Sequence, residues 1–200
     1  EMCIRDSCYL GSKKDWDVPS SASDMPILVL KDDKDYYPCA HCVPCKGVEH
    51  PWPQKVMAAD LQASGFPKFG LKSDQEAAII ALKRKAVDVL RETQSSVVVV
   101  PEESPVGSSQ SNGFIEQFVW TLTGLVRTLK HSAEKLHKVK IGPQHCALTW
   151  AVEYAAQVLA ICQRSGADGK TAWERRRGKQ YGKAMVPWAE AVMYQAEEKK

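Results

Sequence analysis

Long apolar runs are missing from this sequence of 200 residues. No stretch approaches the roughly eighteen consecutive apolar residues of a membrane-spanning helix, so we expect no membrane span. The opening segment, Glu1 to Ser7, is too short and too polar for a secretory signal peptide. An initiator methionine is also missing, so we expect a piece of a longer protein.

The number of cysteines in the sequence is odd. Seven cysteines without an export signal predict reduced thiols and an intracellular protein. Hydrophobic residues make up 44% of the chain and charged residues 26%, which excludes wholesale disorder. A mass of 22.2 kDa is sufficient for one domain with a real core.

The net charge of +3 combines two unlike halves. Residues 1–103 hold 13 Lys and Arg against 16 Asp and Glu, whereas residues 104–200 hold 14 against 8. The halves therefore carry −3 and +6. This asymmetry suits a protein with a carboxylate-rich site and a surface for a polyanion, although on charge alone the favoured explanation is uneven charge on an ordinary soluble surface.

Strand-like segments precede helical ones along the chain. Apolar and alternating segments predict strands at 9–10, 25–30, 36–43, 69–74 and 95–101, the last fully buried because of its four consecutive valines. Helical spacing predicts helices over 51–64, 75–91, 113–137 and 146–165. A loop rich in Gly and Ser spans 105–112, and the tail from residue 166 is basic. This order predicts a mixed sheet covered by helices.

Two carboxylates stand at positions suited to chemistry. Asp74 ends a predicted strand and begins a predicted helix, where it is either a helix N-cap or a metal ligand. Glu116 lies one turn into the helix at 113–137, which Asn112 would cap. Carboxylates that converge from strand ends and a helix are the oxygen ligands that Mg²⁺ needs.

Several segments together carry a family resemblance. Phe69–Glu76, with its strand-ending Asp, and Ser104–Glu116, with its Gln-Ser-x-Gly-x-x-Glu segment opening a long helix, resemble the catalytic core of retroviral and LTR-retrotransposon integrases. Arg127–Lys130, Trp150–Ala156 and Asp168–Arg175 continue the resemblance downstream. It covers about residues 8–195 and is strongest to integrases inside LTR-retrotransposon polyproteins.

This resemblance implies a fold and an activity. The fold would be RNase H-like α/β, with a mixed five-stranded sheet flanked by helices. Residues 1–165 would form the integrase core, truncated at its N-terminal edge, and residues 166–200 a basic C-terminal extension. Asp6, Asp74 and Glu116 would match the family's Asp-Asp-Glu (DDE) triad and hold two Mg²⁺ or Mn²⁺ ions. The activity would be metal-dependent DNA 3′-end processing and strand transfer.

The first carboxylate has two interpretations. In one, Asp6 of the segment Asp6–Gly11 is the genuine first member of the triad, and the chain is a DDE-type polynucleotidyl transferase. In the other, Glu1–Ser7 is a junction fragment that has replaced the native strand. The chain would then be a catalytically defective DNA-binding remnant of a retroelement.

Basic residues predict the DNA contacts that the resemblance implies. We expect these contacts at Arg127, Lys130, Lys135, Lys138, Arg175, Arg176 and Arg177, because such side chains neutralise phosphates. A solvated helix face and a basic tail are the alternative interpretation. Trp120 stands one turn after Glu116, where the retroviral relatives carry a basic DNA-contacting residue. We expect double-stranded DNA (element ends and target) as partner, a homo-oligomer, and the nucleus as the place of the DNA step.

A cysteine-rich segment offers a competing function. Cys39, Cys42 and Cys45 have the Cys-x2-Cys-x2-Cys spacing, with His50 nearby, which would suit a zinc-binding interaction module. The same residues also fit a strand in which Cys39 and His41 alternate with Ala40 and Cys42. In that case the cysteines are structural.

Overall fold

The structure is a computed structural model that describes residues 2–8, 25–103, 113–142 and 145–193, and only the backbone of residues 2–8. The loop expected at 105–112 and the strand expected at 9–10 lie outside the described residues. None of the helices in the described ranges combines the length and the apolar character that a membrane span requires.

Five strands form one mixed sheet, as expected, and their order is β3-β2-β1-β4-β5. Strand β1 pairs antiparallel with β2 and parallel with β4, while β2–β3 is antiparallel and β4–β5 parallel. The first strand lies earlier in the chain than predicted. The strands are β1 (Met2–Cys8), β2 (Ile27–Asp32), β3 (Pro38–Cys42), β4 (Lys68–Ser73) and β5 (Val98–Glu103).

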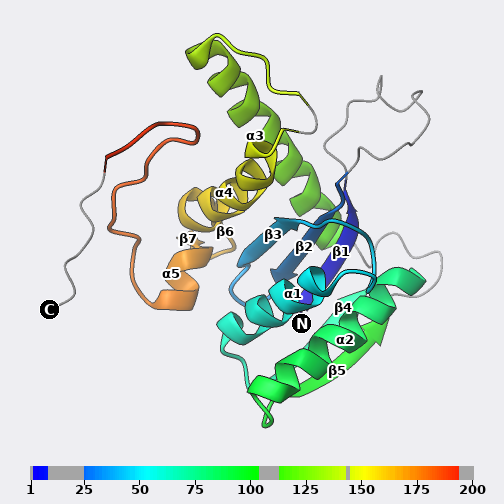
Figure 1. Cartoon of the computed structure of the whole chain (residues 1–200). Helices are drawn as coiled ribbons and strands as arrows, with labels where there is room; N and C mark the ends of the chain where they lie inside the picture. The colour runs from blue at the N-terminus through cyan, green and yellow to red at the C-terminus, as the bar shows by residue number, and fades with distance from the viewer. Residues whose placement is uncertain (1, 9–24, 104–112, 143–144, 194–200) are drawn as a thin grey trace, which may run out of the picture.

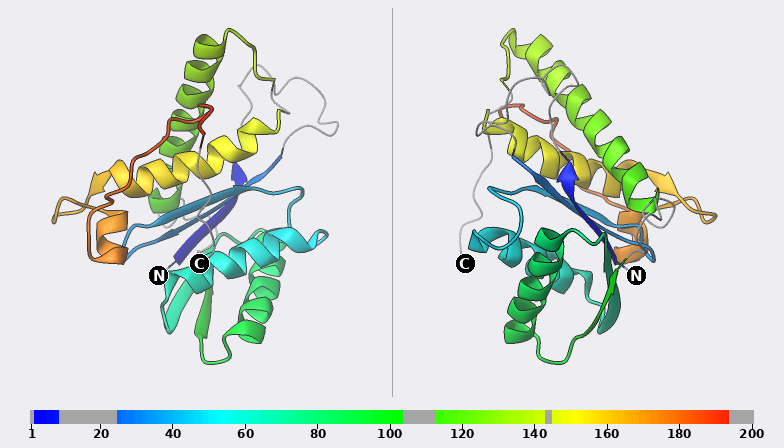
Figure 2. Two further views of the ribbon diagram at one scale, coloured as in Figure 1. Left: turned by 60° about the vertical axis from the view of Figure 1, so that its left-hand side comes forward. Right: turned by 90° about the vertical axis from the view of Figure 1, so that its right-hand side faces the viewer.

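Helices cover both faces of this sheet. One layer holds α1 (Pro51–Ser64) and α2 (Ala77–Thr93), and the other holds α3 (Gly113–His137) and α4 (Ala147–Cys162) (Figures 1 and 2). Alternate residues of β2 enter the two cores, because successive side chains of a strand point to opposite faces. Ile27 and Val29 pack with α3 and α4, while Leu28 and Leu30 pack with α1 and α2.

Local signals fix the ends of α1 as predicted. His50 is the N-cap, and its Nδ1 accepts a hydrogen bond from the Trp52 amide at 3.1 Å. Pro51 and Pro53 fit the first turn, where amide groups have no helical partner. Gly65 ends the helix at φ 72°, a left-handed conformation that glycine adopts without steric cost.

The prediction of a fully buried strand at 95–101 is wrong for β5. Val99 is 8% exposed, but its neighbours Val98 and Val100 are 51% and 41% exposed. The reason is the position of β5 at the edge of the sheet, where none of the described helices covers one of its faces.

The C-terminal part is an ordered appendage to the α3–α4 layer. Helix α4 ends at Cys162, earlier than predicted, because β6 (Arg164–Ser165) and β7 (Lys170–Thr171) pair as a small hairpin. Helix α5 (Ala172–Arg177) follows and begins with a capping box between Thr171 and Glu174. Further on, Trp188 is 5% exposed within the α3–α4 core.

A buried ion pair connects α5 to the sheet. The Arg176 guanidinium lies 2.6 Å from the Asp32 carboxylate, and their side chains are 8% and 1% exposed. Asp32 also accepts hydrogen bonds from the backbone amides of Asp35 and Tyr37 in the β2–β3 turn. The Arg176 guanidinium lies 3.8 Å from the centre of the Tyr37 ring. One arginine thus fixes both the C-terminal helix and the turn.

Removing this arginine should destabilise the whole domain. We expect Arg176→Leu to lower the free energy of unfolding by about 3–5 kcal/mol, because it leaves the Asp32 carboxylate buried without its cation. The measurement is urea denaturation. Arg177→Leu removes the exposed neighbouring charge and should change stability by less than about 0.5 kcal/mol. Equal losses in the two variants would contradict the role given to the buried pair.

Candidate active site at the carboxyl edge of the sheet

Parallel pairing brings Asp6 and Asp74 to one edge of the sheet. Ile4 of β1 is opposite Ser73 of β4, so Asp74 and Asp6 follow within two residues of that pair. Neighbouring strands run about 4.8 Å apart, which places the two backbones side by side. The pairing of β1 with β2 shifts between Arg5 and Cys8, and such irregularities often redirect a strand next to a functional site.

Asp74 is not the cap of α2. The N-cap is Glu76, which makes no side-chain cap hydrogen bond, so the helix-cap interpretation is wrong. Asp74 itself is half-buried, and its Oδ1 is buried without a hydrogen-bond partner in the described part of the chain. A buried carboxylate oxygen without a donor is costly, and a bound cation would remove that cost.

Glu116 lies in the first turn of α3, half-buried. Ile115 and Phe118 on the same turn are 2% and 3% exposed, so this end of the helix is held against the sheet. Helix α3 contacts β1 and β2, and Figure 1 shows its first turns beside β1. Glu116 therefore lies in the helical layer that packs on β1, the strand that carries Asp6.

Two charged residues of the site were missed by the sequence analysis. Lys83 of α2 is 3% exposed, and its ammonium group donates hydrogen bonds to the carbonyls of Leu71 (3.2 Å) and Glu102 (2.8 Å). Burial lowers the pKa of Lys83, while the nearby carboxylates of Glu103 and Asp74 act to raise it.

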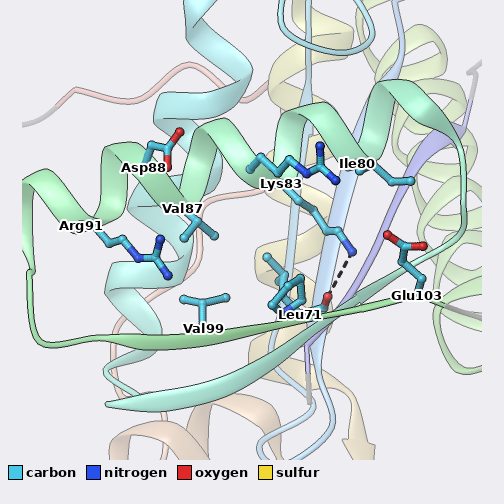
Figure 3. Close-up of a pocket in the computed structure, with 10 residues that line it drawn as sticks. Leu71, Ile80, Lys83, Val87, Asp88, Arg91, Val99 and Glu103 are labelled. Carbon is cyan, nitrogen blue, oxygen red and sulfur yellow. Dashed lines mark hydrogen bonds between the residues drawn. The ribbon is translucent and has the colours of Figure 1, made fainter.

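Glu103 is the second missed residue. It is the last residue of β5 and pairs with Ser73 of β4, so it lies at the same edge of the sheet as Asp74. Figure 3 shows Lys83 extending toward Leu71 with Glu103 beside it, at one end of a cavity of about 360 Å³ between α2 and β4–β5. The acidic pair Glu102–Glu103 at the end of a predicted strand is the signal that could have indicated it.

The donor atoms of this edge fit a hard divalent ion. Asp74 and Glu116 offer carboxylate oxygens, and the Asp74 Oδ1 lacks a donor among the described residues. Within the described side chains no three His, Cys, Asp or Glu residues form a metal-binding group. That finding does not cover Asp6, of which only the backbone is described.

The zinc interpretation of the cysteine-rich segment is wrong. Cys42 lies in the α3–α4 core, whereas Cys39 packs against the α1–α2 core on the opposite face of β3. Burial raises the pKa of the Cys39 thiol well above its usual value, which disfavours the thiolate that zinc requires. The described cysteines are free thiols: Cys39, Cys42, Cys45, Cys146 and Cys162.

His41 of the same segment joins the two helical layers around the free edge of β3. Its Nε2 lies 2.9 Å from the Asp60 carboxylate of α1, and its Nδ1 lies 3.1 Å from the Glu153 carboxylate of α4. Burial acts to lower the pKa of His41, but the hydrogen bonds and charges of Asp60 and Glu153 outweigh it and raise the pKa.

The predicted DNA-contacting residues fall into two groups. Arg127, Lys135 and Lys138 are exposed along α3 and just beyond its end, and Lys130 lies 4.0 Å from Glu134. On the same helix Trp120 is 84% exposed.

The arginines of α5 form the second group, and two of them are used inside the domain. Arg176 pairs with Asp32, and hydrogen bonds from Arg175 lower the pKa of Asp168 to about 2. Only Arg177 of this cluster is exposed.

Comparisons with solved structures give the fold a family context. The catalytic core domain of BIV integrase has a TM-score of 0.52 at 15% identity, covering 88% of this chain and 93% of that one. The HTLV-2 integrase catalytic core domain in complex with magnesium, in a trimeric form, has a TM-score of 0.52 at 14% identity, covering 88% and 94%. The chain has the RNase H-like fold of the retroviral integrase core.

A larger assembly matches as well. A simian T-cell lymphotropic virus intasome, in complex with PP2A regulatory subunit B56 gamma, has a TM-score of 0.55 at 12% identity, covering 98% of this chain and 59% of that one. No protein-family model matches the sequence, and a search of curated proteins gives no match. The integrase-core fold therefore rests on topology and shape.

His41 should make stability depend on pH. A histidine whose pKa is raised on folding contributes stability below its unfolded pKa of about 6.5, and this contribution is lost as the pH rises through the folded pKa. We expect His41→Gln to be less stable than the wild type at pH 6, and the difference to shrink by pH 8.5. The measurement is urea denaturation at both pH values. A difference that grows with pH would contradict the ion-pair arrangement.

Proposed function

We propose that this chain is the catalytic core of an integrase-type polynucleotidyl transferase, which processes DNA 3′ ends and joins them to target DNA. The observation that carries the proposal is the parallel pairing of β1 with β4. It brings Asp6 and Asp74 to one sheet edge, with α3 and Glu116 packed over β1. The integrase-core fold supports the proposal.

In this proposal Asp6, Asp74 and Glu116 hold two Mg²⁺ or Mn²⁺ ions. Such ions supply Lewis acidity for displacement at a phosphodiester. The half-buried Asp74 and Glu116 contribute anionic oxygens, and the buried Lys83 ammonium offsets part of the negative charge near Asp74. If Glu1–Ser7 is not native, the same fold lacks its first carboxylate and only binds DNA.

The exposed face of α3 is the proposed DNA contact. From residue 113 to 142 the chain holds five Lys and Arg against two Glu, which favours a polyanion. Arg127 is exposed, and no ion pair or hydrogen bond engages it within the described part of the chain. The exposed Trp120 indole, two turns earlier, offers a flat surface on which a base can stack.

The partners and the place of action are part of the same proposal. Double-stranded DNA, as element ends and as target, is the substrate, and a homo-oligomer would hold two ends together. The protein would be intracellular, and the DNA step would take place in the nucleus. Exposed charges on α3 and Arg177 supply the contacts, whereas Arg175 and Arg176 do not take part, because carboxylates within the domain occupy them.

Asp74→Asn should abolish strand transfer without unfolding the domain. We expect the divalent-ion-dependent rate to fall at least about a thousandfold, since several kcal/mol of transition-state stabilisation depend on bound metal. Stability should change by less than about 1 kcal/mol, because Oδ1 has no hydrogen-bond partner to lose in the described structure. The measurement is strand transfer with Mg²⁺ or Mn²⁺ beside thermal unfolding.

Asp88→Asn is the matched control, because Asp88 is an exposed carboxylate on α2. It should keep the wild-type rate. Equal strand transfer by Asp74→Asn and the wild type would refute the catalytic role of Asp74. If every variant and the wild type bind DNA but none shows strand transfer, the chain is the catalytically defective DNA-binding remnant.

Arg127→Gln and Lys135→Gln should weaken DNA binding for all sequences alike. Each lost phosphate contact should reduce the slope of log affinity against log salt by about one. The measurement is a salt series of binding constants with two unrelated duplexes. Lys55→Gln on α1, in the opposite layer, makes the same charge change and should leave the slope unchanged. A sequence-dependent loss, or an equal effect of Lys55→Gln, would argue against this surface.

A further inference from the structure

The β2–β3 turn contains a strained tyrosine. Tyr36 has φ 58°, a left-handed conformation that costs free energy for a bulky residue. The carboxylate of Asp32 enforces it, since it accepts hydrogen bonds from the amides of Asp35 and Tyr37, on either side of Tyr36. Arg176 in turn holds Asp32 in place. These contacts therefore hold the turn in one conformation.

This conformation presents the Tyr36 ring to the start of α3. The Tyr36 and Phe114 ring centres are 5.8 Å apart with a tilt of 56°. The Arg175 guanidinium also lies 4.8 Å from the Tyr36 ring centre, and Arg175 pairs with Asp168. The ring thus connects helix α5 with the first turn of α3.

Lys31 of β2 completes the contact. Its ammonium group lies 4.2 Å from the centre of the Phe114 ring and 5.3 Å from that of Phe118. It is also 5.9 Å from the Tyr36 ring centre. A cation at these distances is attracted to each ring face. Two rings of α3 are therefore fixed over β2, and Glu116 lies between them in the sequence.

We propose that Tyr36 is a positioning residue, which seats the first turn of α3 and so fixes where Glu116 projects. The catalytic consequence rests on the proposed function, whereas the seating of α3 is a property of the fold alone. The strain at Tyr36 is then the cost of presenting an aromatic ring to Phe114. An unstrained turn would not direct the side chain of residue 36 in this way.

Hydrogen exchange tests the seating of the helix. The amides of Gln117–Trp120 are the first whose helical hydrogen bonds close the start of α3. In Tyr36→Asn, which tolerates the left-handed conformation but lacks the ring, these amides should exchange about five- to tenfold faster than in the wild type. Tyr36→Phe keeps the ring and should exchange at the wild-type rate.

Lys34→Ala is the matched control within the same turn. The Lys34 ammonium lies 5.1 Å from the centre of the Phe66 ring, so its removal should leave the Gln117–Trp120 amides unchanged. Amides of α4 serve as an internal reference in every variant. Wild-type exchange in Tyr36→Asn, or equal acceleration across α4, would overturn the proposal.

Strand transfer separates this inference from the proposed function. In Tyr36→Asn the Mn²⁺ concentration for half-maximal rate should rise several-fold, while the salt dependence of DNA binding stays as in the wild type. Tyr36→Phe should restore the wild-type metal requirement. If the wild type shows no strand transfer, the proposed function fails, and the exchange result still decides the role of Tyr36. An unchanged metal requirement beside faster exchange would refute the link to Glu116.

Discussion

The buried pair of Arg176 and Asp32 couples the C-terminal helix α5 to the turn between β2 and β3. Asp32 ends β2, and its carboxylate organises the turn to β3 through two backbone amides. Arg176 brings α5 to that turn, so the C-terminal appendage and the central sheet share one charged contact. Two ionised groups this far from water are stable because they pair with each other, while backbone amides also donate to Asp32 and the Tyr37 ring lies against Arg176. From this turn, contacts extend through Tyr36 and Phe114 to the helix that carries Glu116.

The candidate site combines charges that the fold forces together. Parallel pairing of β1, β4 and β5 brings the ends of three strands to one edge, with Asp6, Asp74 and Glu103 near them. Lys83 is buried beneath this edge and bonds to carbonyls of β4 and β5. An excess of carboxylates next to a single ammonium group favours an additional cation. The negative charge at this edge is thus not fully balanced, which suits the binding of a divalent metal ion.

The sequence predicted a mixed sheet and three of the four long helices closely, because alternation, helical spacing and the Gly65 stop are local signals. The number of strands followed from the family resemblance, and the first strand was expected too late in the chain. The sequence singled out Asp74 and Glu116 through motifs, and their catalytic role stays a prediction. Its errors concern long-range packing. Four consecutive valines do not reveal that β5 is an edge strand. The alternation within 39–42, in contrast, did predict a strand with structural cysteines, and Cys39 and Cys42 lie on its opposite faces. The basic run Arg175–Arg177 likewise gave no sign that two of its members pair with distant carboxylates, although Thr171 and Glu174 did have the spacing of a helix start.

Anomalous diffraction from crystals of the chain grown with Mn²⁺ would show whether Asp74 and Glu116 share a metal site. We expect an anomalous peak at the carboxyl edge of β1 and β4, with oxygens of Asp74 and Glu116 as ligands and the two carboxylates within about 8 Å of each other. Asp6 should complete the site if the first strand is native. A structure in which Asp74 and Glu116 lie on opposite faces of the sheet, with no peak near Asp74, would contradict the shared metal site.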